Sequence, residues 1–107
     1  MDKFDEDLGL HILEKTSEES LLFDFDLSTK IRTGDTIASF DTCVAYSKGL
    51  VSGSEDLVIS DLSFSGTLAQ AVISAGTAYE RYWIEATVTT VAGDIVVGVS
   101  ILNITPL

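Results

Sequence analysis

The chain has 107 residues, 46% of them hydrophobic, and a formal net charge of −11 from 17 acids and 6 bases. This length fits one domain. The acidic balance speaks against nucleic-acid binding and against docking on anionic membranes, because phosphates require Lys and Arg for neutralisation. No stretch approaches the roughly 20 apolar residues of a membrane helix. The acidic start also lacks the layout of a signal peptide, so we expect neither membrane insertion nor export by that route.

Residues 1–19 are predicted to be an acidic N-terminal arm, with seven acids among them. Four apolar residues have a spacing that would form a short helical stripe within this arm. They are the first candidate interface residues: Phe4, Leu8, Ile12 and Leu13. Two interpretations stay open, an arm that becomes ordered on a partner and a plain flexible terminus. On the first, deletion of residues 1–19 is expected to leave the fold intact and to abolish assembly.

From residue 20 onward the pattern is that of β-strands, because apolar and polar residues alternate and β-branched residues are frequent. Clusters that contain Gly, Ser, Thr and Asp separate the segments as turns. The predicted strands are 20–27, 36–46, 57–64, 67–74, 79–90 and 95–104, of which the segment 57–64 is one strand or two short ones. The last two, joined by a short turn at Gly93, are predicted to pair as a hairpin.

This arrangement of short strands and turns is typical of a β-sandwich, and helical periodicity after residue 20 is missing, which excludes α/β folds. We therefore predict an all-β protein. Residues 20–107 are expected to form an immunoglobulin-like β-sandwich of about seven strands, with residues 1–19 as an N-terminal extension. The predicted core residues are Phe23, Phe25, Ile37, Ile73, Tyr82, Ile84 and Val88.

Residues with the chemistry of an active site are scarce. The one histidine, His11, falls in the predicted arm, and the one cysteine, Cys43, is predicted to be a small buried thiol. Neither a Cys/His metal spacing nor a glycine-rich phosphate loop is present. Asp24 and Asp26 share one face of a strand. Such a pair could bind a calcium ion, but the favoured interpretation is that both are solvated residues of an edge strand. We predict no catalytic residues, no cofactor and no metal, and we do not expect an enzyme.

Aromatic residues gather near the start of the strand predicted over 79–90. Tyr82 suits the tyrosine corner that many sandwiches have at this position. Trp83 points to the opposite face of the strand, so we predict that Trp83 and the nearby Arg81 belong to an interface. The alternative for this aromatic cluster is a stacking platform for sugars.

Three segments together resemble a known family. They are the Gly-Asp-Thr-Ile run at residues 34–37, the stretch 68–82 and the Val-Thr-Thr run at 88–90 with Gly93. This order resembles the small immunoglobulin-like neck or fibre–tail adaptor proteins of tailed bacteriophages, over roughly residues 20–104. Ala75 stands where the family has the first glycine of a pair, and we expect a less extreme turn there.

The resemblance implies a structural protein of the virion, made in the host cytoplasm and placed in the neck or collar at the head-to-tail junction. There it would brace the connector or attach fibres, as a homo-oligomeric ring. The implied partners are other virion proteins, namely connector, tail or fibre subunits. The alternatives are an immunoglobulin-like module that binds receptors or glycans, and a tail or capsid decoration protein.

Overall fold

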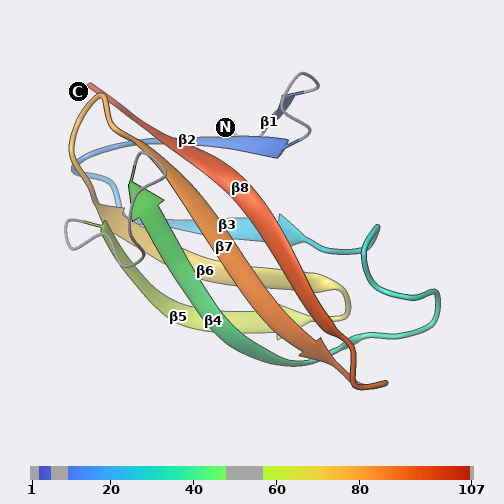
Figure 1. Cartoon of the computed structure of the whole chain (residues 1–107). Coiled ribbons are helices and arrows are strands. Elements are labelled where there is room, and N and C mark those ends of the chain that lie inside the picture. The colour runs from blue at the N-terminus through green and yellow to red at the C-terminus, as the bar shows by residue number, and fades with distance from the viewer. Residues whose placement is uncertain (1–2, 6–9, 48–56, 107) are drawn as a thin grey trace.

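The computed structural model describes residues 3–5, 10–47 and 57–106 of the chain, and these form strands and turns without a helix. Figure 1 shows the strands in two layers. The strands are β1 (Lys3–Asp5), β2 (Leu10–Thr16), β3 (Leu21–Asp26), β4 (Ile37–Ser47), β5 (Leu57–Ser65), β6 (Leu68–Ala75), β7 (Arg81–Thr90) and β8 (Ile95–Thr105). A helix long and apolar enough to cross a membrane was not found among the described residues.

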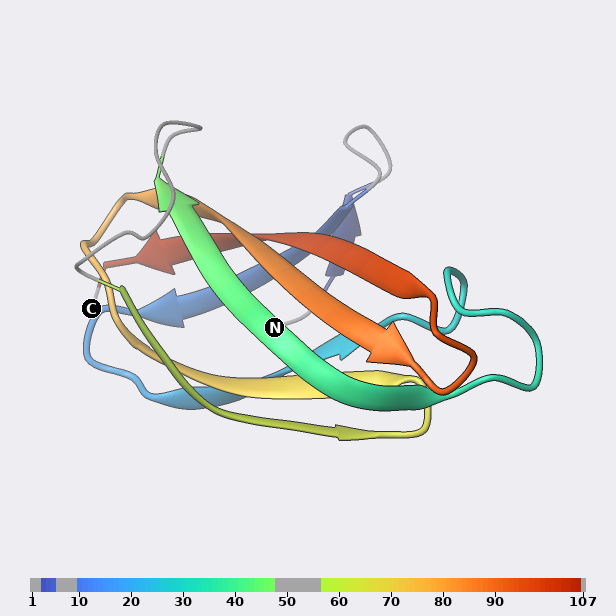
Figure 2. The same ribbon diagram turned by 60° about the horizontal axis from the view of Figure 1, so that its bottom comes forward.

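One layer is a five-stranded sheet in the order β1-β2-β8-β7-β4, and the other is a three-stranded sheet in the order β3-β6-β5. Figure 2 shows the three-stranded sheet lying below the five-stranded one. Neighbouring strands are antiparallel except β2 and β8, which are parallel. The predicted hairpin is confirmed, since β7 and β8 pair from Arg81 with Asn103 to Thr89 with Ile95.

The connectivity is that of an immunoglobulin-like sandwich. If β3 to β8 are taken as the second to seventh strands of that fold, its two sheets have the orders β3-β6-β5 and β4-β7-β8, as observed here. The first long strand, β2, pairs with β8 rather than with β3. The predicted all-β sandwich is therefore confirmed.

The core lies between the two sheets because alternate residues of each strand face the opposite layer. Along β7, the side chains of Tyr82, Ile84, Ala86 and Val88 are completely buried. They meet inward residues of the other sheet, among them Phe23, Phe25 and Ile73. All of the residues predicted for the core, Phe23, Phe25, Ile37, Ile73, Tyr82, Ile84 and Val88, are buried.

The helical stripe predicted within residues 1–19 is wrong, because residues 10–16 form strand β2. This strand pairs with β8 from His11 with Ser100 to Thr16 with Thr105. Leu13 is part of the core. Deletion of residues 1–19 would therefore remove a strand of the five-stranded sheet and a core residue, and we now expect it to destabilise the fold rather than leave it intact.

Lys15 interrupts the apolar pattern of β2, because it is a charged residue at an inward position of the strand. Its side chain is buried. The Nζ group donates hydrogen bonds to the carbonyl oxygens of Thr16, at 2.6 Å, and of Ala75 in the other sheet. Burial lowers the pKa of Lys15, and the charge of Glu19 opposes this effect. Lys15 thus connects the two sheets by hydrogen bonds at one end of the sandwich.

Candidate interaction face

The outer face of the five-stranded sheet carries a row of apolar and aromatic residues on the side away from the core. Backbone pairing aligns Ile12 of β2 with Ile101 of β8, Ile101 with Trp83 of β7, and Trp83 with Tyr46 of β4. Cross-strand neighbours of this kind have their Cβ atoms about 5 Å apart, so their side chains contact one another. Ile101 is fully buried although it does not belong to the core between the sheets.

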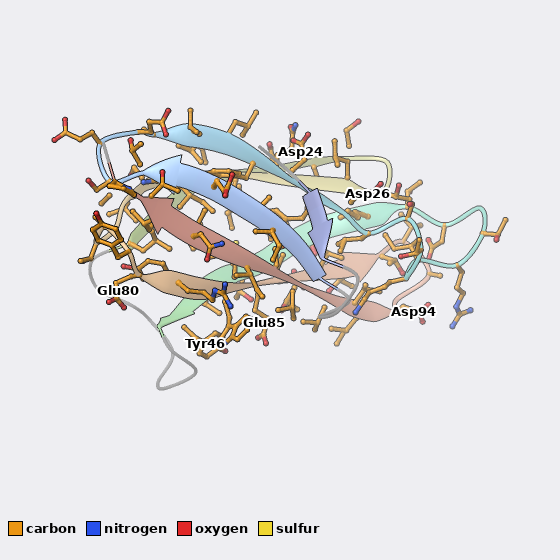
Figure 3. The ribbon with its side chains drawn as sticks, turned by 90° about the horizontal axis from the view of Figure 1, so that it is seen from above. Asp24, Asp26, Tyr46, Glu80, Glu85 and Asp94 are labelled. Carbon is orange, nitrogen blue, oxygen red and sulfur yellow. The ribbon has the colours of Figure 1, made fainter. Side chains whose placement is uncertain are left out.

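A second row lies beside the first, with Val99, Glu85 and Val44 in register. The Tyr46 hydroxyl donates a hydrogen bond to Glu85 Oε1 at 3.3 Å. Figure 3 shows these two side chains next to each other. Loss of hydration and the neighbouring Glu85 carboxylate raise the pKa of Tyr46 above its ordinary value, which already keeps the phenol neutral at physiological pH. The face therefore combines an apolar centre with a neutral phenol hydroxyl group and a carboxylate.

Polar residues border the apolar rows on both sides. Toward the start of β7, the exposed Arg81 donates a hydrogen bond from Nε to Asn103 Oδ1 at 3.0 Å. Toward the end of β7, the Asp41 carboxylate accepts hydrogen bonds from the hydroxyls of Thr89, at 2.5 Å, and Ser39, at 2.7 Å. These bonds hold the pKa of Asp41 below its ordinary value. An apolar centre with a polar rim is the usual composition of a protein–protein interface.

The predicted interface residues divide between this face and other places. Ile12, Trp83 and Arg81 lie on its rows and rim. Leu13 faces the core, so the prediction of an interface role is wrong for it; in a strand, the residue next to outward Ile12 must point inward. Phe4 lies in β1, opposite His11 in the register, and Leu8 lies outside the described residues.

Tyr46, Ile101, Val44 and Val99 complete the face, and the sequence prediction did not include them. Each belongs to a segment that was expected to be a strand. What was missing was the register, because only the pairing of β4 with β7 and of β8 with β2 aligns these residues with Trp83. A sequence pattern of period two indicates which residues share a face within a strand but not which residues of two strands are neighbours.

The Gly-Asp-Thr-Ile run at residues 34–37 has a structural role. Asp35 Oδ1 accepts hydrogen bonds from the backbone N–H groups of Thr36, at 2.9 Å, and of Ala92 in the β7–β8 turn, at 3.2 Å. Thr90 and these amides hold the pKa of Asp35 below its ordinary value. The run therefore fixes the start of β4 against the β7–β8 hairpin rather than forming part of a binding site.

The stretch from Ala75 to Tyr82 also shapes the fold. Thr77 donates a backbone hydrogen bond to the buried Tyr82 hydroxyl at 3.1 Å, which is the contact of a tyrosine corner. Ala75 has a φ of 64° and Gly76 a φ of 100°. The expectation of a less extreme turn at Ala75 is wrong, because the alanine itself adopts the left-handed conformation that glycine favours.

Other residues with reactive or ligand groups do not form a site in the described part of the chain. Asp24 and Asp26 project from β3, on the side of the molecule away from Tyr46 and Glu85 (Figure 3). Both are exposed, and Asp24 accepts a hydrogen bond from Gln70 at 2.8 Å. The described residues contain no group of three or more metal-ligating side chains. Cys43 is half-buried, and burial raises the pKa of its thiol to about 12.

A search of curated proteins found no match to the chain. A family model described as podophage GP4 fiber-tail adaptor protein gp77 matches residues 15–102, which include β3 to β7 and most of β8. The matched range also contains the segments at 34–37, 68–82 and 88–93 on which the resemblance rested. The chain therefore belongs to the podophage fibre–tail adaptor family and is a structural phage protein of the adaptor class.

Proposed function

We propose that this protein is a neck adaptor of the virion, located at the head-to-tail junction, where it joins fibres to the tail or braces the connector. Membership of the fibre–tail adaptor family supports the adaptor role. In this proposal the outer face of the five-stranded sheet binds another virion protein. The protein acts by holding two components together, and no step of the proposal is catalytic.

The observation that carries this proposal is the outer-face row of the five-stranded sheet, in which the half-buried Trp83 and Tyr46 lie in line with Ile12 and Ile101, which are already buried within the chain. Trp and Tyr are enriched among the residues that dominate binding energy in interfaces. The outer face of the other sheet offers a contrast, since one of its rows aligns Asp24, Gln70 and Ser63. The three-stranded sheet also exposes apolar residues, namely Leu22, Val58, Leu62 and Phe64, whereas the five-stranded sheet pairs a tryptophan with a tyrosine on its outer face.

The proposal includes a homo-oligomeric ring around the tail. Repeated copies in a ring meet through two different surfaces, and each copy also contacts the component that the ring surrounds. A net charge of −11 on every copy makes neighbouring copies repel one another in solution. We therefore expect the ring to form on a basic partner surface, and the free protein to stay dispersed at low ionic strength.

Substitution of the central tryptophan tests the face directly. Phage particles produced with Trp83→Ser are expected to contain at least tenfold less of this protein than wild-type particles. Arg81→Glu, at the exposed rim, should also reduce incorporation without disturbing the core. Leu22→Ser is the matched control, because Leu22 is exposed on the other sheet. A folded Trp83→Ser protein that enters particles at the wild-type level would contradict the proposal.

A second candidate function is the binding of glycans or host receptors. The pairing of Trp83 with Tyr46 supports it, because adjacent aromatic rings are suited to stacking against a sugar. Immunogold labelling of intact particles separates the possibilities. Gold at the head–tail junction supports the adaptor, gold at fibre tips supports the receptor-binding module, and gold over the capsid or along the tail supports a decoration protein.

A further inference from the structure

The second half of strand β5 has an unusual exposure for a strand of a sandwich. A strand in a two-layer fold normally buries every second residue. In β5 this holds only at the start, where Leu57 is buried and Ile59 half-buried, whereas every residue from Ser60 to Ser65 is exposed. Both faces of this half-strand are therefore open to solvent.

Large apolar side chains lie on this exposed segment and beside it. The exposed fractions are 50% for Val58, 40% for Leu62 and 41% for Phe64. β5 is also an edge strand, with β6 as its one partner in the described sheet. Figure 2 shows β5 along the lower side of the molecule. An edge strand of this kind offers both unpaired backbone groups and apolar side chains to another chain.

The segment is held in a fixed shape without a partner. Between Ser60 and Ser63 the register with β6 shifts, and Asp61 adopts a φ of 53°. This is a β-bulge with an aspartate in the left-handed conformation that glycine or asparagine takes more readily. Beyond the bulge, pairing with β6 resumes, and the Gly66 carbonyl accepts a hydrogen bond from Ile37 N–H at 2.9 Å.

The charged residues of the described strands around this edge have one sign. Strands β4, β5 and β6 contain Asp41 and Asp61, both exposed, and their sequences contain no Lys or Arg. Natural edge strands are often protected by lysine, and β5 lacks this protection. A second copy of the chain would bring Asp61 and ten further net negative charges to the same edge. The complementary partner is instead an extended segment that carries Lys or Arg among apolar residues.

The other edge of the same sheet differs. In β3, Phe23 and Phe25 are buried in the core, so one face of that strand is already covered. An added strand there would bury little apolar surface beyond Leu22. The addition of a strand to β5 would cover Leu62 and Phe64 and would provide main-chain hydrogen bonds along the edge.

We propose that the β5 edge, from Val58 to Ser65, binds an extended basic segment of another virion protein by strand addition. This inference rests on the proposed adaptor function, because an adaptor needs a second contact surface beside the outer face of the five-stranded sheet. The two surfaces belong to different sheets of the sandwich, so two partners have separate strands to bind.

Paired substitutions test this edge in phage particles. Leu62→Lys places a positive charge on β5, and Leu22→Lys makes the same change on the exposed part of β3. We expect Leu62→Lys to lower the amount of this protein in particles, or the amount of the partner retained with it, at least tenfold. Leu22→Lys should change it less than twofold. Asp61→Lys should reduce it more than Asp61→Asn, because the first reverses the charge and the second only removes it.

A photo-crosslinking residue at Ser63, which is exposed on the same segment, identifies what lies against the edge in assembled particles. A crosslink to a Lys- or Arg-containing segment of a different virion protein is the expected result. A crosslink to a second copy of this chain, or none, would overturn the inference, as would equal incorporation of the two leucine variants. If Leu62→Lys enters particles normally while Trp83→Ser does not, the edge inference fails and the proposed adaptor face stands. If both enter normally, the adaptor face fails as well.

Discussion

Replacement of Tyr82 by phenylalanine tests whether the tyrosine corner supports the sandwich as the structure indicates. The Tyr82 ring is completely buried, and its hydroxyl accepts the hydrogen bond from Thr77 N–H at 3.1 Å. Tyr82→Phe keeps the ring in the core and removes this acceptor. The substitution therefore isolates the hydrogen bond from the packing of the aromatic ring.

The expected loss in the free energy of unfolding is about 1–2 kcal/mol, the usual cost of removing one partner of a hydrogen bond at a largely buried site. For a domain of this size each kcal/mol lowers the melting temperature by about 4–8 °C, so Tm should fall by roughly 5–15 °C. The loss should be local, with faster hydrogen exchange at the Thr77 amide.

Urea unfolding of the wild-type and variant proteins, followed by tryptophan fluorescence from Trp83, measures the change. Tyr46→Phe is the matched control, because the Tyr46 hydroxyl lies on the outer face and its bond to Glu85 is longer, at 3.3 Å. Tyr82→Phe should cost clearly more stability than Tyr46→Phe. Equal losses in the two variants, or unchanged exchange at Thr77, would refute the assignment of a stabilising tyrosine corner.

Three further predictions concern other parts of the fold. Leu13→Ala should lower the free energy of unfolding by about 2–5 kcal/mol, because it leaves a cavity in the core, and a loss below about 0.5 kcal/mol in denaturant titration would contradict an integral β2. Cys43, with its pKa raised to about 12, should react with a thiol reagent at pH 8 far more slowly in native than in unfolded protein, and equal rates would contradict its burial. Asp41 has a lowered pKa in the folded state, so its contribution to stability is complete above its unfolded pKa and is lost as pH falls through the lower folded pKa. Asp41→Asn should therefore reduce the stability difference between pH 6 and pH 3, and a difference of wild-type size would contradict this effect.

The sandwich could be predicted from the sequence where burial is regular. In β7 and β8, alternation places Tyr82, Ile84 and Val88 on one face, and Gly93 marks the turn between the strands with its positive φ of 96°. Such strands can be predicted from the sequence, because each pairs with its neighbour along the chain and every second residue is apolar.

Strand β2 could not be predicted in this way. The inward positions of β2 include Leu13 and the charged Lys15, which interrupts the alternation of apolar residues. The partner of β2 is β8, about 90 residues away in sequence, as Lys15 and Ile104 illustrate. The hydrogen bonds that compensate for the buried Lys15 charge come from tertiary structure, so a local pattern gives no sign of them.

The candidate interaction face could be predicted only in part, because pairing between distant strands brings its residues together. Alternation in β7 indicates that Trp83 lies opposite the core face. It does not reveal that Ile101 and Tyr46 are its neighbours, because this depends on register. In β5 the bulge at Asp61 alters the alternation, and Leu62 is exposed. A bulge depends on one residue in an uncommon backbone conformation, which the apolar pattern does not encode.

The most direct test of the account is electron cryomicroscopy of the intact virion at a resolution that traces this chain. The account predicts that the chain lies at the head-to-tail junction, between tail and fibre components, with Trp83 and Tyr46 buried against another virion protein. A chain located elsewhere in the particle, or one at the junction with this face open to solvent, would contradict the central claim.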